Sequence, residues 1–533
     1  MPHETRLLHD AWYYARVAAG LAHYQLSRKS SNPDPFVQIR EQLRLREQRF
    51  LRLARSVLEQ KDHLYRRLFD AAGCSYADLE SDVARHGLRA ALRRLLSSGV
   101  YITHDEFRGR TELVRSGRHI PCDPGAFDNP HGRGSNPQAT SGSTGRRFIT
   151  SVSNRYLLYR EEHETLESRI MDLPNRARII VGAILPSTWP IRRQVTWSRL
   201  GVPLDRWFVA GVADSSSIYR AVTGMLVTQV NALGGTARQP EYLPPNDFTP
   251  VAECLARYRA ANRPAYVRTM VSMATRIASA ARDRALDIRG TVFSVSGEPL
   301  TPAKRSMIED AGAGVYPFYG ATEFGTFGFA CPRMQGEDRV HLFEDGVMLV
   351  PQSAGAESQH GLFVTSLLPW SPRIVINVGV DDSAVIEPGS CDCEYQRLGF
   401  TTHAHSIFSY GKVTSQGTTI DARDLAELIE TILPARFGGS PGDFQLVEID
   451  AADQGGIVLR VRPKLASADL REIRDFFLDQ LGKIPGGSLS QRLWKFSGGL
   501  RVVIEEPEAT STGKIHPLRL LGSSARITEP RPR

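Results

Sequence analysis

A stretch rich in hydroxyl side chains and glycine, 139-ATSGSTGRRFITS-151, is the first candidate for chemistry in this chain. It has no apolar face to bury, so packing does not explain its composition. Glycines let the backbone approach a ligand and expose its N–H groups, and hydroxyls add hydrogen-bond donors. Such a loop binds a phosphate group, or else it is a flexible surface turn. It does not follow the pattern GxxxxGK with Ser or Thr next, so it is not a P-loop of that NTPase class.

Two further polar segments lie far downstream, 296-SGEPLTPAKRSMIEDAGAGVYPFYGATEFG-325 and 508-EATSTGKIHPL-518. In this order and at this separation, the three segments resemble the motifs of the adenylate-forming superfamily of acyl-CoA synthetases and related ligases. The middle segment in particular is similar to phenylacetate-CoA ligases, in which a GxEP sequence leads through a helix into a YGxTE element. The resemblance extends roughly from residue 60 to residue 520.

The resemblance implies an ATP site built from several short segments. The β- and γ-phosphates are expected on the hydroxyl-rich loop, at Ser141, Gly142, Ser143, Thr144 and Gly145. The adenine is expected beside the middle segment, at Gly297, Glu298, Pro299, Tyr319 and Gly320. The ribose-binding aspartate must come from 374-IVINVGVDDSAVI-386, where Asp381 is the first choice and Asp382 the second.

Three residues carry the chemistry that the resemblance implies. Thr322 is expected to bond a phosphate oxygen, Glu323 to hold Mg²⁺, and Lys514 to bridge the carboxylate and the α-phosphate during adenylation. A carboxylate that attacks a phosphate brings two anions together, so the site must neutralise charge before the reacting atoms meet. Taken alone, Glu323 is also typical of a carboxylate at a helix N-terminus, and Lys514 of an exposed lysine in a turn.

The chain departs from the resembled family in three places. Arg146 and Arg147 follow the loop where relatives usually have a lysine and then a proline, so its outer half is expected to handle phosphate differently. The segment that contains Asp381 resembles the family's RYRTGD sequence only loosely. The usual hinge signature is not recognisable in 400-FTTHAHSIFSYGKVTSQG-417, so rotation of a small domain is inferred from Lys514 alone.

A group of soft or borderline metal ligands follows the middle segment. It consists of Cys331, His341, Cys391 and Cys393. In several relatives of phenylacetate-CoA ligase the matching positions look like a structural zinc site, and four such ligands suit closed, tetrahedral Zn²⁺. The alternative is three buried free cysteines and an unrelated histidine. His403 and His405 are further candidates, or else surface residues near the hinge.

These residues need an α/β framework that brings strand ends together. Buried strands are predicted over 177–185, 291–295 and 314–320. Apolar residues at helical spacing predict a helix over 264–281. Tyr266 and Met270 in that helix are candidates for the wall of the acid pocket, or else ordinary core residues. Thr301-Pro302 is typical of a helix start, with a hydroxyl N-cap and proline at the first position.

The chain is expected to fold as α/β, with a large N-terminal adenylation domain of several subdomains and a smaller, mobile α+β domain at the C-terminus. A helical region is predicted over 1–100, the core adenylation domain over 101–405 and the small domain over 406–533. Strands at 445–450, 457–463 and 500–506, with a helix near 467–481, would build the small domain that carries Lys514.

The bulk composition is that of a globular protein with several folding units. The 533 residues are 41% hydrophobic and 23% charged. No apolar run of about 18 residues predicts a membrane helix, and no secretory signal is recognised, so the cytoplasm is expected. The net charge of +8 is consistent with a nucleic-acid partner. However, the excess lies in amphipathic helical segments such as 38–68, and no nucleic-acid-binding motif accompanies it.

The sequence therefore predicts an AMP-forming ligase that activates a carboxylic acid, aryl or similar, as acyl-AMP and releases pyrophosphate. The acyl group would then pass to a thiol of coenzyme A or of a carrier protein. ATP and Mg²⁺ are the expected cofactors, with Zn²⁺ in a structural role. Other superfamily members use amines or activate nitrite, so the second half-reaction stays open. A basic nucleic-acid-binding protein and a catalytically silent relative are the alternatives. No membrane or nucleic-acid partner is expected, and the oligomeric state is left open, a homodimer included.

Overall fold

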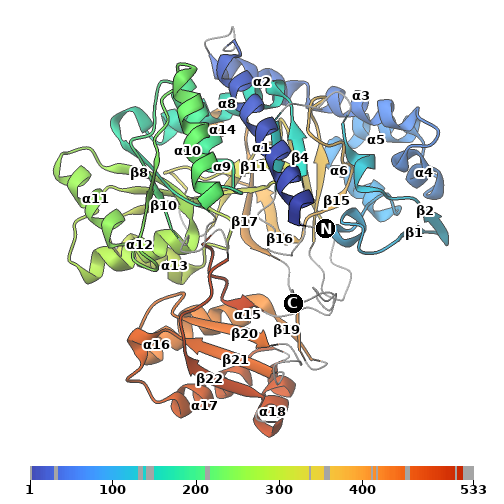
Figure 1. Cartoon of the computed structure of the whole chain (residues 1–533). Helices are drawn as coiled ribbons and strands as arrows, with labels where there is room; N and C mark the ends of the chain where they lie inside the picture. Colours follow the sequence, from blue (N-terminus) through green and yellow to red (C-terminus); the bar gives the residue numbers. More distant parts are fainter. Residues whose placement is uncertain are drawn as a thin grey trace.

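The computed structural model describes most of the chain in two parts (Figure 1). It describes residues 3–28, 34–129, 136–139, 149–210, 217–334, 338–352, 361–409, 412–415, 418–449, 456–485, 487–497, 499–510 and 513–519. A large part contains α1 to α14, and a smaller part below it in Figure 1 contains α15 to α18. Among the described residues, no helix is both long and apolar enough to cross a membrane.

A ten-stranded sheet forms the centre of the large part, in the order β16-β17-β12-β11-β10-β9-β8-β5-β6-β7. Its parallel half consists of β5 (Ala177–Val181), β6 (Arg206–Val209), β7 (Pro240–Tyr242), β8 (Ala265–Met270), β9 (Val292–Ser296) and β10 (Gly314–Ala321). Its antiparallel half consists of β11 (Gly325–Phe329), β12 (Val340–Leu342), β16 (Asp382–Pro388) and β17 (Thr402–Ser409). The mixed sheet with flanking helices confirms the predicted α/β class.

Helices cover both faces of the parallel half. Neighbouring residues of a strand point to opposite faces, and in β5 Ile179 joins one hydrophobic cluster and Ile180 another. The Ile179 cluster includes α11 (Thr249–Ala260), α12 (Val271–Asp283) and α13 (Pro302–Asp310). The Ile180 cluster includes α1 (His3–Leu26), α9 (Trp189–Arg199) and α10 (Ser217–Ala232). Burial on both faces explains why β5, β8 and β9 are buried along nearly their whole length rather than at alternate residues.

The helix predicted over 264–281 is wrong in its first third. Residues 265–270 form β8, which pairs in parallel with β5 and β9, and the helix α12 begins only at Val271. A short apolar run satisfies helical spacing as readily as it fills a buried strand. Thr301 precedes α13 as predicted, but its side chain makes no cap. The hydroxyl donates instead to Glu430 Oε2 at 2.8 Å, a residue of the smaller part.

The first hundred residues are helical, as predicted. The helices after α1 are α2 (Pro35–Arg44), α3 (Arg46–Leu58), α4 (Leu64–Ala71), α5 (Tyr76–His86) and α6 (Leu88–Ser97), with the short α7 (His104–Phe107) next. Phe50, Leu53 and Leu58 of α3 are buried. They share a cluster with the small sheet of β13 (Val347–Pro351), β14 (Leu362–Ser366) and β15 (Val378–Gly379), so these helices pack as part of the large domain.

Two hairpins and one long helix are further elements of the large part. The hairpins are β1 (Leu113–Arg115) with β2 (Arg118–Ile120), and β3 (Asn136–Ala139) with β4 (Ile149–Val152). The helix α8 (Asn154–Ile170) follows β4, and Ser153 caps it by accepting a hydrogen bond from Tyr156 N. The side chains of α8 that face inward include several glutamates, which is unusual for a buried helix face.

The smaller part is an α+β unit with its own core. Its helices are α15 (Ala422–Glu427), α16 (Leu433–Phe437), α17 (Leu470–Leu481) and α18 (Gly487–Ser497), with a π-helical turn over Leu428–Ile432. Its four-stranded sheet has β22 (Leu500–Ile504), β21 (Gly456–Val461), β20 (Phe444–Ile449) and β23 (Leu518–Arg519) in that order, and β18 (Lys412–Ser415) pairs with β19 (Thr418–Asp421). The predicted α+β character of this end is confirmed.

Candidate active site

A cavity of about 310 Å³ lies at the carboxyl ends of three neighbouring parallel strands. Its wall includes Thr269 and Met270 of β8, Ser296 at the end of β9 with Gly297 just after it, and Gly320, Ala321 and Thr322 at the end of β10. Open α/β sheets bind their ligands at this edge, where the strands end and loops begin. The cavity is therefore the candidate active site.

Lys514 of the far C-terminal segment reaches this cavity. Gly297 has φ +85°, a conformation that favours glycine. A Cβ atom placed on Gly297 would lie 3.1 Å from Lys514 Nζ and 2.9 Å from Met270 Sδ. The lysine therefore ends beside the GxEP turn, in the same cavity as Thr322. We call Gly297, Thr322 and Lys514 the strand-end site.

The loop that carries Lys514 is fixed against α12. Ser272 N and Oγ donate to the two carboxylate oxygens of Glu298, at 2.7 and 3.0 Å. The same Oγ accepts a hydrogen bond from Ile515 N at 3.3 Å. Glu298 thus positions Ser272, and Ser272 holds the backbone next to Lys514. A position in the adenine slot, which the sequence predicts for Glu298, stays a prediction.

A second set of contacts holds the loop from the side of the small domain. Gln445 of β20 donates through Nε2 to the carbonyl oxygens of Glu508 and His516, at 3.0 and 2.9 Å. Lys514 N donates to Thr510 Oγ1 at 3.1 Å, which closes a turn before the lysine. The lysine is therefore presented by both domains together.

Burial lowers the pKa of Lys514, and the carboxylates of Glu298 and Asp382 partly offset that effect. The ammonium group is held in a place with little water, near two anions but within salt-bridge distance of no carboxylate among the described residues. A cation of this kind attracts a negative charge that enters the cavity more strongly than an exposed lysine would.

The two aspartates proposed for the ribose make different contacts. Asp382 Oδ2 accepts a hydrogen bond from the buried hydroxyl of Tyr319 at 2.9 Å. Asp381 is exposed, and its backbone N–H donates to Nδ1 of His104 in α7 at 3.1 Å. The side chain of Asp382 therefore lies with Tyr319, a residue that the resemblance places along the nucleotide, whereas the backbone of Asp381 contacts α7. The ribose role of either aspartate stays a prediction.

Glu323 is buried, with 7% of its surface exposed, and forms an ion pair with Arg108. The pair joins the end of β10 to the residue that follows α7. An Mg²⁺ ion on Glu323 would have to share the carboxylate with this guanidinium. Glu323 does not line the cavity, and among the described residues that do line it the one carboxylate is Glu164, which is also paired. The described residues therefore do not by themselves fit a bound Mg²⁺, and no step below uses one.

The predicted phosphate loop, Ser141 to Gly145, lies outside the described residues, as do Arg146 and Arg147. The strands on either side of it are described: β3 pairs with β4, with Ala139 opposite Ile149. Arg192, which lines the cavity, donates from Nη2 to the carbonyl oxygen of Pro137 in β3. The hairpin that carries the loop is thus anchored at the cavity.

Of the two predicted pocket residues, Met270 lines the cavity and Tyr266 does not. Tyr266 is fully buried inside β8, and its hydroxyl donates to Glu167 Oε1 at 2.5 Å. Tyr266 and Met270 share one face of β8, but Met270 stands at the carboxyl end of the strand, where the cavity lies, and Tyr266 stands near its start, inside the core. Pro299 is not among the lining residues either.

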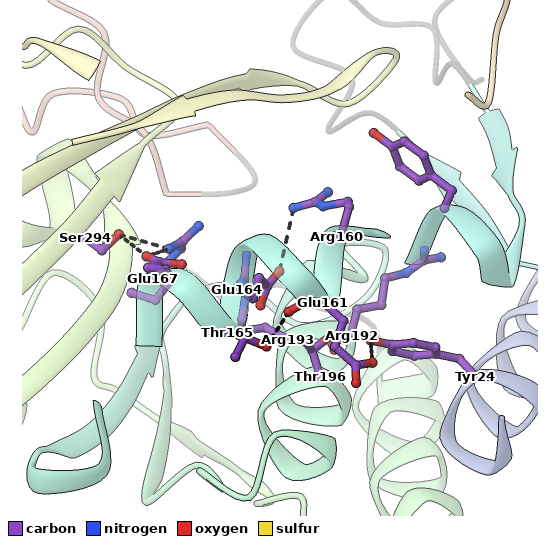
Figure 2. A network of polar contacts seen from close by, with 12 residues as sticks. Tyr24, Arg160, Glu161, Glu164, Thr165, Glu167, Arg192, Arg193, Thr196 and Ser294 are labelled. Atoms are coloured by element: carbon purple, nitrogen blue, oxygen red, sulfur yellow. Dashed lines mark hydrogen bonds and ion pairs between the residues drawn. The ribbon is translucent and has the colours of Figure 1, made fainter. Parts of the chain in front are cut away.

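One side of the cavity is made of arginines, which we call the arginine wall: Arg160, Arg192, Arg193 and Arg268. Arg160 comes from α8 and Arg192 and Arg193 come from α9 (Figure 2), and Arg268 comes from β8. Arg193 forms an ion pair with Glu164, and Arg160 lies 3.8 Å from the same glutamate. Arg268 pairs with Glu167 and stacks on Phe318, with its guanidinium carbon 3.6 Å from the ring centre. Buried charges of this kind need partners, and α8 supplies them.

Little in the sequence indicates this wall. Its α9 part comes from 187-STWPIRRQV-195, where Thr188 and Trp189 also line the cavity. Adjacent arginines on a helix are usually solvated, so burial of both Arg192 and Arg193 is not expected from composition. The sequence feature that could have indicated buried arginines is the pattern 161-EEHETLE-167, which places four glutamates on one helix of the same domain.

The four predicted metal ligands lie together beside the antiparallel half of the sheet. The ligand atoms of Cys331, His341, Cys391 and Cys393 are all within 4.8 Å of one another. The Sγ atoms of Cys331 and Cys391 are 3.7 Å apart, and His341 Nε2 lies 3.2 Å from the Sγ atoms of Cys391 and Cys393. Cys393 stands at the start of α14 (Glu394–Leu398).

The geometry of this cluster suits a tetrahedral ion. A tetrahedron with Zn–S bonds of about 2.3 Å has edges of about 3.8 Å, close to the sulfur separation observed. His341 Nδ1 lies 2.8 Å from the carbonyl oxygen of Phe400, which assigns the proton to Nδ1 and leaves Nε2 free to bind metal. His403 is buried rather than on the surface, and its ring packs edge-on against His341 without joining the cluster. His405 lies instead beside Glu387.

Comparison with known proteins gives distant likenesses only. No protein-family model matches the chain, and no curated protein matches it. Among solved structures, it is similar to an AMP-forming acyl-CoA synthetase/AMP-acid ligase II-like protein from Dyadobacter fermentans, with 15% identity over 71% of this chain and 86% of that one and a TM-score of 0.28. Fatty acyl-adenylate ligases from E. coli and L. pneumophila match at 13% identity over 72% of this chain and 68% of theirs, with a TM-score of 0.33.

A third likeness is to GH3.15 acyl acid amido synthetase, with 9% identity over 87% of this chain and 93% of that one. Its TM-score is 0.45. Likenesses at these identities and scores are too distant to assign an activity to this chain, which must come from its own residues.

Proposed function

We propose that this protein is an ATP-dependent ligase that activates a carboxylic acid as acyl-AMP and transfers the acyl group to a thiol. The observation that carries the proposal is the meeting of separate segments: Lys514 lies beside Gly297 and lines the same cavity as Thr322. These residues belong to the two described segments whose sequences resemble adenylate-forming ligases. A structural lysine in an exposed turn would not be buried at the carboxyl ends of parallel strands.

The first step is the attack of a carboxylate oxygen on the α-phosphorus of ATP. A carboxyl O–P bond forms, the bond from the α-phosphorus to the bridging oxygen breaks, and pyrophosphate leaves with the electron pair. Lys514 would neutralise the two anions as they meet, and the Thr322 hydroxyl would bond a phosphate oxygen. In the second step, the sulfur of coenzyme A or of a carrier protein attacks the acyl carbon. AMP leaves, and the thiol proton passes to solvent.

The test of the first step is acid-dependent exchange of labelled pyrophosphate into ATP. An adenylate-forming enzyme shows exchange that requires a carboxylic acid and does not require a thiol. A nucleic-acid-binding protein or a catalytically silent relative shows none with any acid in a broad aryl and alkyl panel. Absence of exchange across that panel would refute the proposal.

The second step is assigned by its product. Incubation of acid and ATP with coenzyme A, with a pantetheine-bearing carrier protein, or with a panel of amines should give a thioester in one of the first two mixtures. Mass spectrometry identifies it directly. Formation of an amide without any thioester would replace the thiol by an amine as acceptor and leave the adenylation step unchanged.

We also propose that the cysteine and histidine cluster binds one structural Zn²⁺ ion through Cys331, His341, Cys391 and Cys393. Support comes from the spacing of the four ligand atoms and from the hydrogen bond that fixes the His341 tautomer. Bound there, zinc would join the segment after β11, strand β12 and the start of α14, and it would leave no position for substrate. Elemental analysis should give about one zinc per chain, lost in Cys393→Ser and retained in Cys74→Ser. Zinc-free wild-type protein prepared in zinc-containing medium would contradict the assignment.

A further inference from the structure

The charges around the cavity do not balance. Three of its nearby arginines have buried glutamate partners: Arg193 pairs with Glu164, Arg268 with Glu167, and Arg199, just behind the wall, with Glu161 at 2.8 Å. Arg192 has no carboxylate partner among the described residues. Arg160 has only the more distant contact to Glu164. Among the described residues that line the cavity, four are arginines and one, Glu164, is an acid.

The unmatched guanidinium is buried and has free donors. Arg192 Nε and Nη1 are inaccessible to solvent and have no hydrogen-bond partner among the described residues, while Nη2 donates to the Pro137 carbonyl. Burial lowers the pKa of this arginine to about 10, so it remains charged at neutral pH. A buried, charged donor without a partner is destabilising unless something supplies an acceptor.

Trp189 adds a neighbouring donor on the same helix. It precedes Arg192 by one helical turn, so both side chains leave α9 on the same side, and both line the cavity. Trp189 Nε1 is buried and, within the described ranges, has no partner. Gly182 accommodates the indole, because a Cβ there would lie 2.5 Å from Trp189 Cζ2. These donors stand at the first turn of α9, where the helix dipole also favours an anion and the N-cap residue Thr188 makes no side-chain cap.

We propose that the acid activated by this enzyme carries a second anionic group, and that Arg192 and Trp189 bind that group. The inference rests on the proposed function, since it assigns the cavity to the acid. One end of the acid, the reacting carboxylate, meets Lys514 and Thr322. The other end supplies the missing negative charge at the first turn of α9. A carboxylate fits, because its two oxygens can accept hydrogen bonds from the charged guanidinium of Arg192 and from Trp189 Nε1.

The volume of the cavity limits the substrate class. The cavity volume of about 310 Å³ is near the lower end of the range for small-molecule sites. The reacting carboxylate of the acid must also fit inside this volume. This favours a compact dicarboxylic acid, such as a single ring or a short chain with acid groups at both ends, over a long fatty acid. A phosphonate or a sulfonate at the second position is also anionic, and the panel of acids below distinguishes these groups from a carboxylate.

The first experiment compares acids that differ only in the second charge. Terephthalate and adipate are assayed by pyrophosphate exchange beside their monoamides, which keep the size and remove one charge, and beside benzoate and hexanoate. 4-Sulfobenzoate and 4-phosphonobenzoate test the other anions. We expect kcat/KM for at least one doubly charged acid to exceed that of its neutral counterpart by about 10-fold to 100-fold.

The outcomes separate this inference from the proposed function. Exchange with none of the acids refutes the proposed function itself. Exchange that is equal for diacid and monoamide, or better with the monoacids, leaves adenylation established and refutes the second anionic group. Preference for the sulfonate or phosphonate over the carboxylate keeps the anion site and corrects its ligand.

The second experiment assigns the site to Arg192. Arg192→Gln should reduce the preference for the doubly charged acid over its monoamide to within about 3-fold, while Arg192→Lys should retain part of it. Arg52→Gln, which removes an exposed arginine of α3, is the matched control and should keep the full preference. Circular dichroism and thermal denaturation check that each variant is folded.

The KM for ATP distinguishes an acid site from a nucleotide site. If Arg192→Gln raises KM for ATP and slows all acids equally, Arg192 serves the nucleotide phosphates and the proposal is wrong. If the variant does not fold, Trp189→Phe is used instead. It removes the indole donor, keeps an aromatic ring, and should lower the same preference with KM for ATP unchanged.

Discussion

The two sides of the cavity are built in different ways. The strand-end site consists of backbone turns at Gly297 and Thr322 and one lysine that arrives from the small domain. The arginine wall consists of long side chains on α8, α9 and β8, and buried glutamates hold most of them in place. The first side depends on how two domains meet. The second is fixed within the large domain before any ligand arrives.

This difference indicates that the strand-end site serves catalysis, whereas the ion pairs behind the arginine wall serve stability. Lys514 is a buried cation with no salt-bridge partner in the part of the chain that the structure describes, so the folded state gains little from its charge, which is available to a ligand. Arg268 and Glu167 are 1% exposed and neutralise each other, so the folded state depends on both. Changes in the strand-end site should therefore affect turnover, and changes behind the arginine wall should affect folding.

The largest expected effect tests the wall. Glu167→Ala leaves Arg268 buried without its carboxylate and removes the acceptor of the Tyr266 hydroxyl. We expect a loss of about 3–5 kcal/mol in the free energy of unfolding. Urea denaturation followed by circular dichroism measures it. The control is Glu59→Ala, which breaks an exposed ion pair with Arg55 and should change stability by less than about 0.5 kcal/mol. Equal losses in the two variants would show that the buried pairs are not what holds the wall.

The next effect tests the strand-end site. Lys514→Ala should lower acid-dependent pyrophosphate exchange by about 100-fold to 1,000-fold, because one preorganised cation at the reacting anions is lost. Its denaturation midpoint should stay near that of the wild type, since burial already disfavours the charged lysine. Lys495→Ala, at an exposed position of α18, should change neither quantity. If Lys514→Ala keeps its pyrophosphate exchange, or if it loses stability and activity together, the proposed difference between the strand-end site and the arginine wall is wrong.

A smaller effect concerns the docking of the lysine loop and depends on pH. Burial, helped by the charges of Lys514 and Lys304, lowers the pKa of His516 to about 4 from an ordinary 6.5. The unfolded or undocked chain thus binds a proton more readily than the docked one. The stabilisation that neutral His516 gives to the docked loop is complete above pH 6.5. It is lost as the pH falls toward 4, and the loss is at most about 3 kcal/mol.

Hydrogen exchange of the backbone around Lys514 measures this loss. Protection at residues 513–519 should fall between pH 6.5 and pH 4 in the wild type, and fall less in His516→Gln, which cannot gain the charge. His86→Gln, at an exposed position, should behave like the wild type. If wild type and His516→Gln lose protection in parallel, another group controls the docking.

The strand-end site was largely predictable from the sequence, because short motifs encode it locally. A glycine at positive φ, a hydroxyl after a strand and a lysine after glycine each have a recognisable context, and the fold brings together Gly297, Thr322 and Lys514. The same locality explains the four metal ligands, which the structure places within 4.8 Å of one another. The α/β class followed equally from strand-like segments that alternate with helices.

The arginine wall was not predictable in this way, because burial of a charge is a property of packing. Arg193 and Glu164 lie on different helices, and nothing in either helix alone shows that the other will face it. The strand status of Tyr266 was missed for a related reason: β8 is buried on both faces, so its pattern does not alternate and resembles part of the helix that follows. Thr301 likewise satisfied a local helix-cap pattern, but a carboxylate from the other domain binds its hydroxyl.

The smallest expected effect isolates the contact between Gly297 and Lys514. Gly297→Ala and Gly234→Ala place a Cβ at similar φ values, +85° and +81°, so each should lose about 1–2 kcal/mol of stability through backbone strain. Only at position 297 does the new Cβ meet other atoms, 3.0 Å from Lys514 Cε and 2.9 Å from Met270 Sδ, while none of the described atoms lies within 4 Å at position 234. Gly297→Ala should therefore also reduce pyrophosphate exchange by about 10-fold, because the lysine is displaced from the reacting anions. If both variants lose stability equally and both keep full exchange, the close approach of the lysine to the GxEP turn has no part in catalysis, and the strand-end site must be redrawn around other residues.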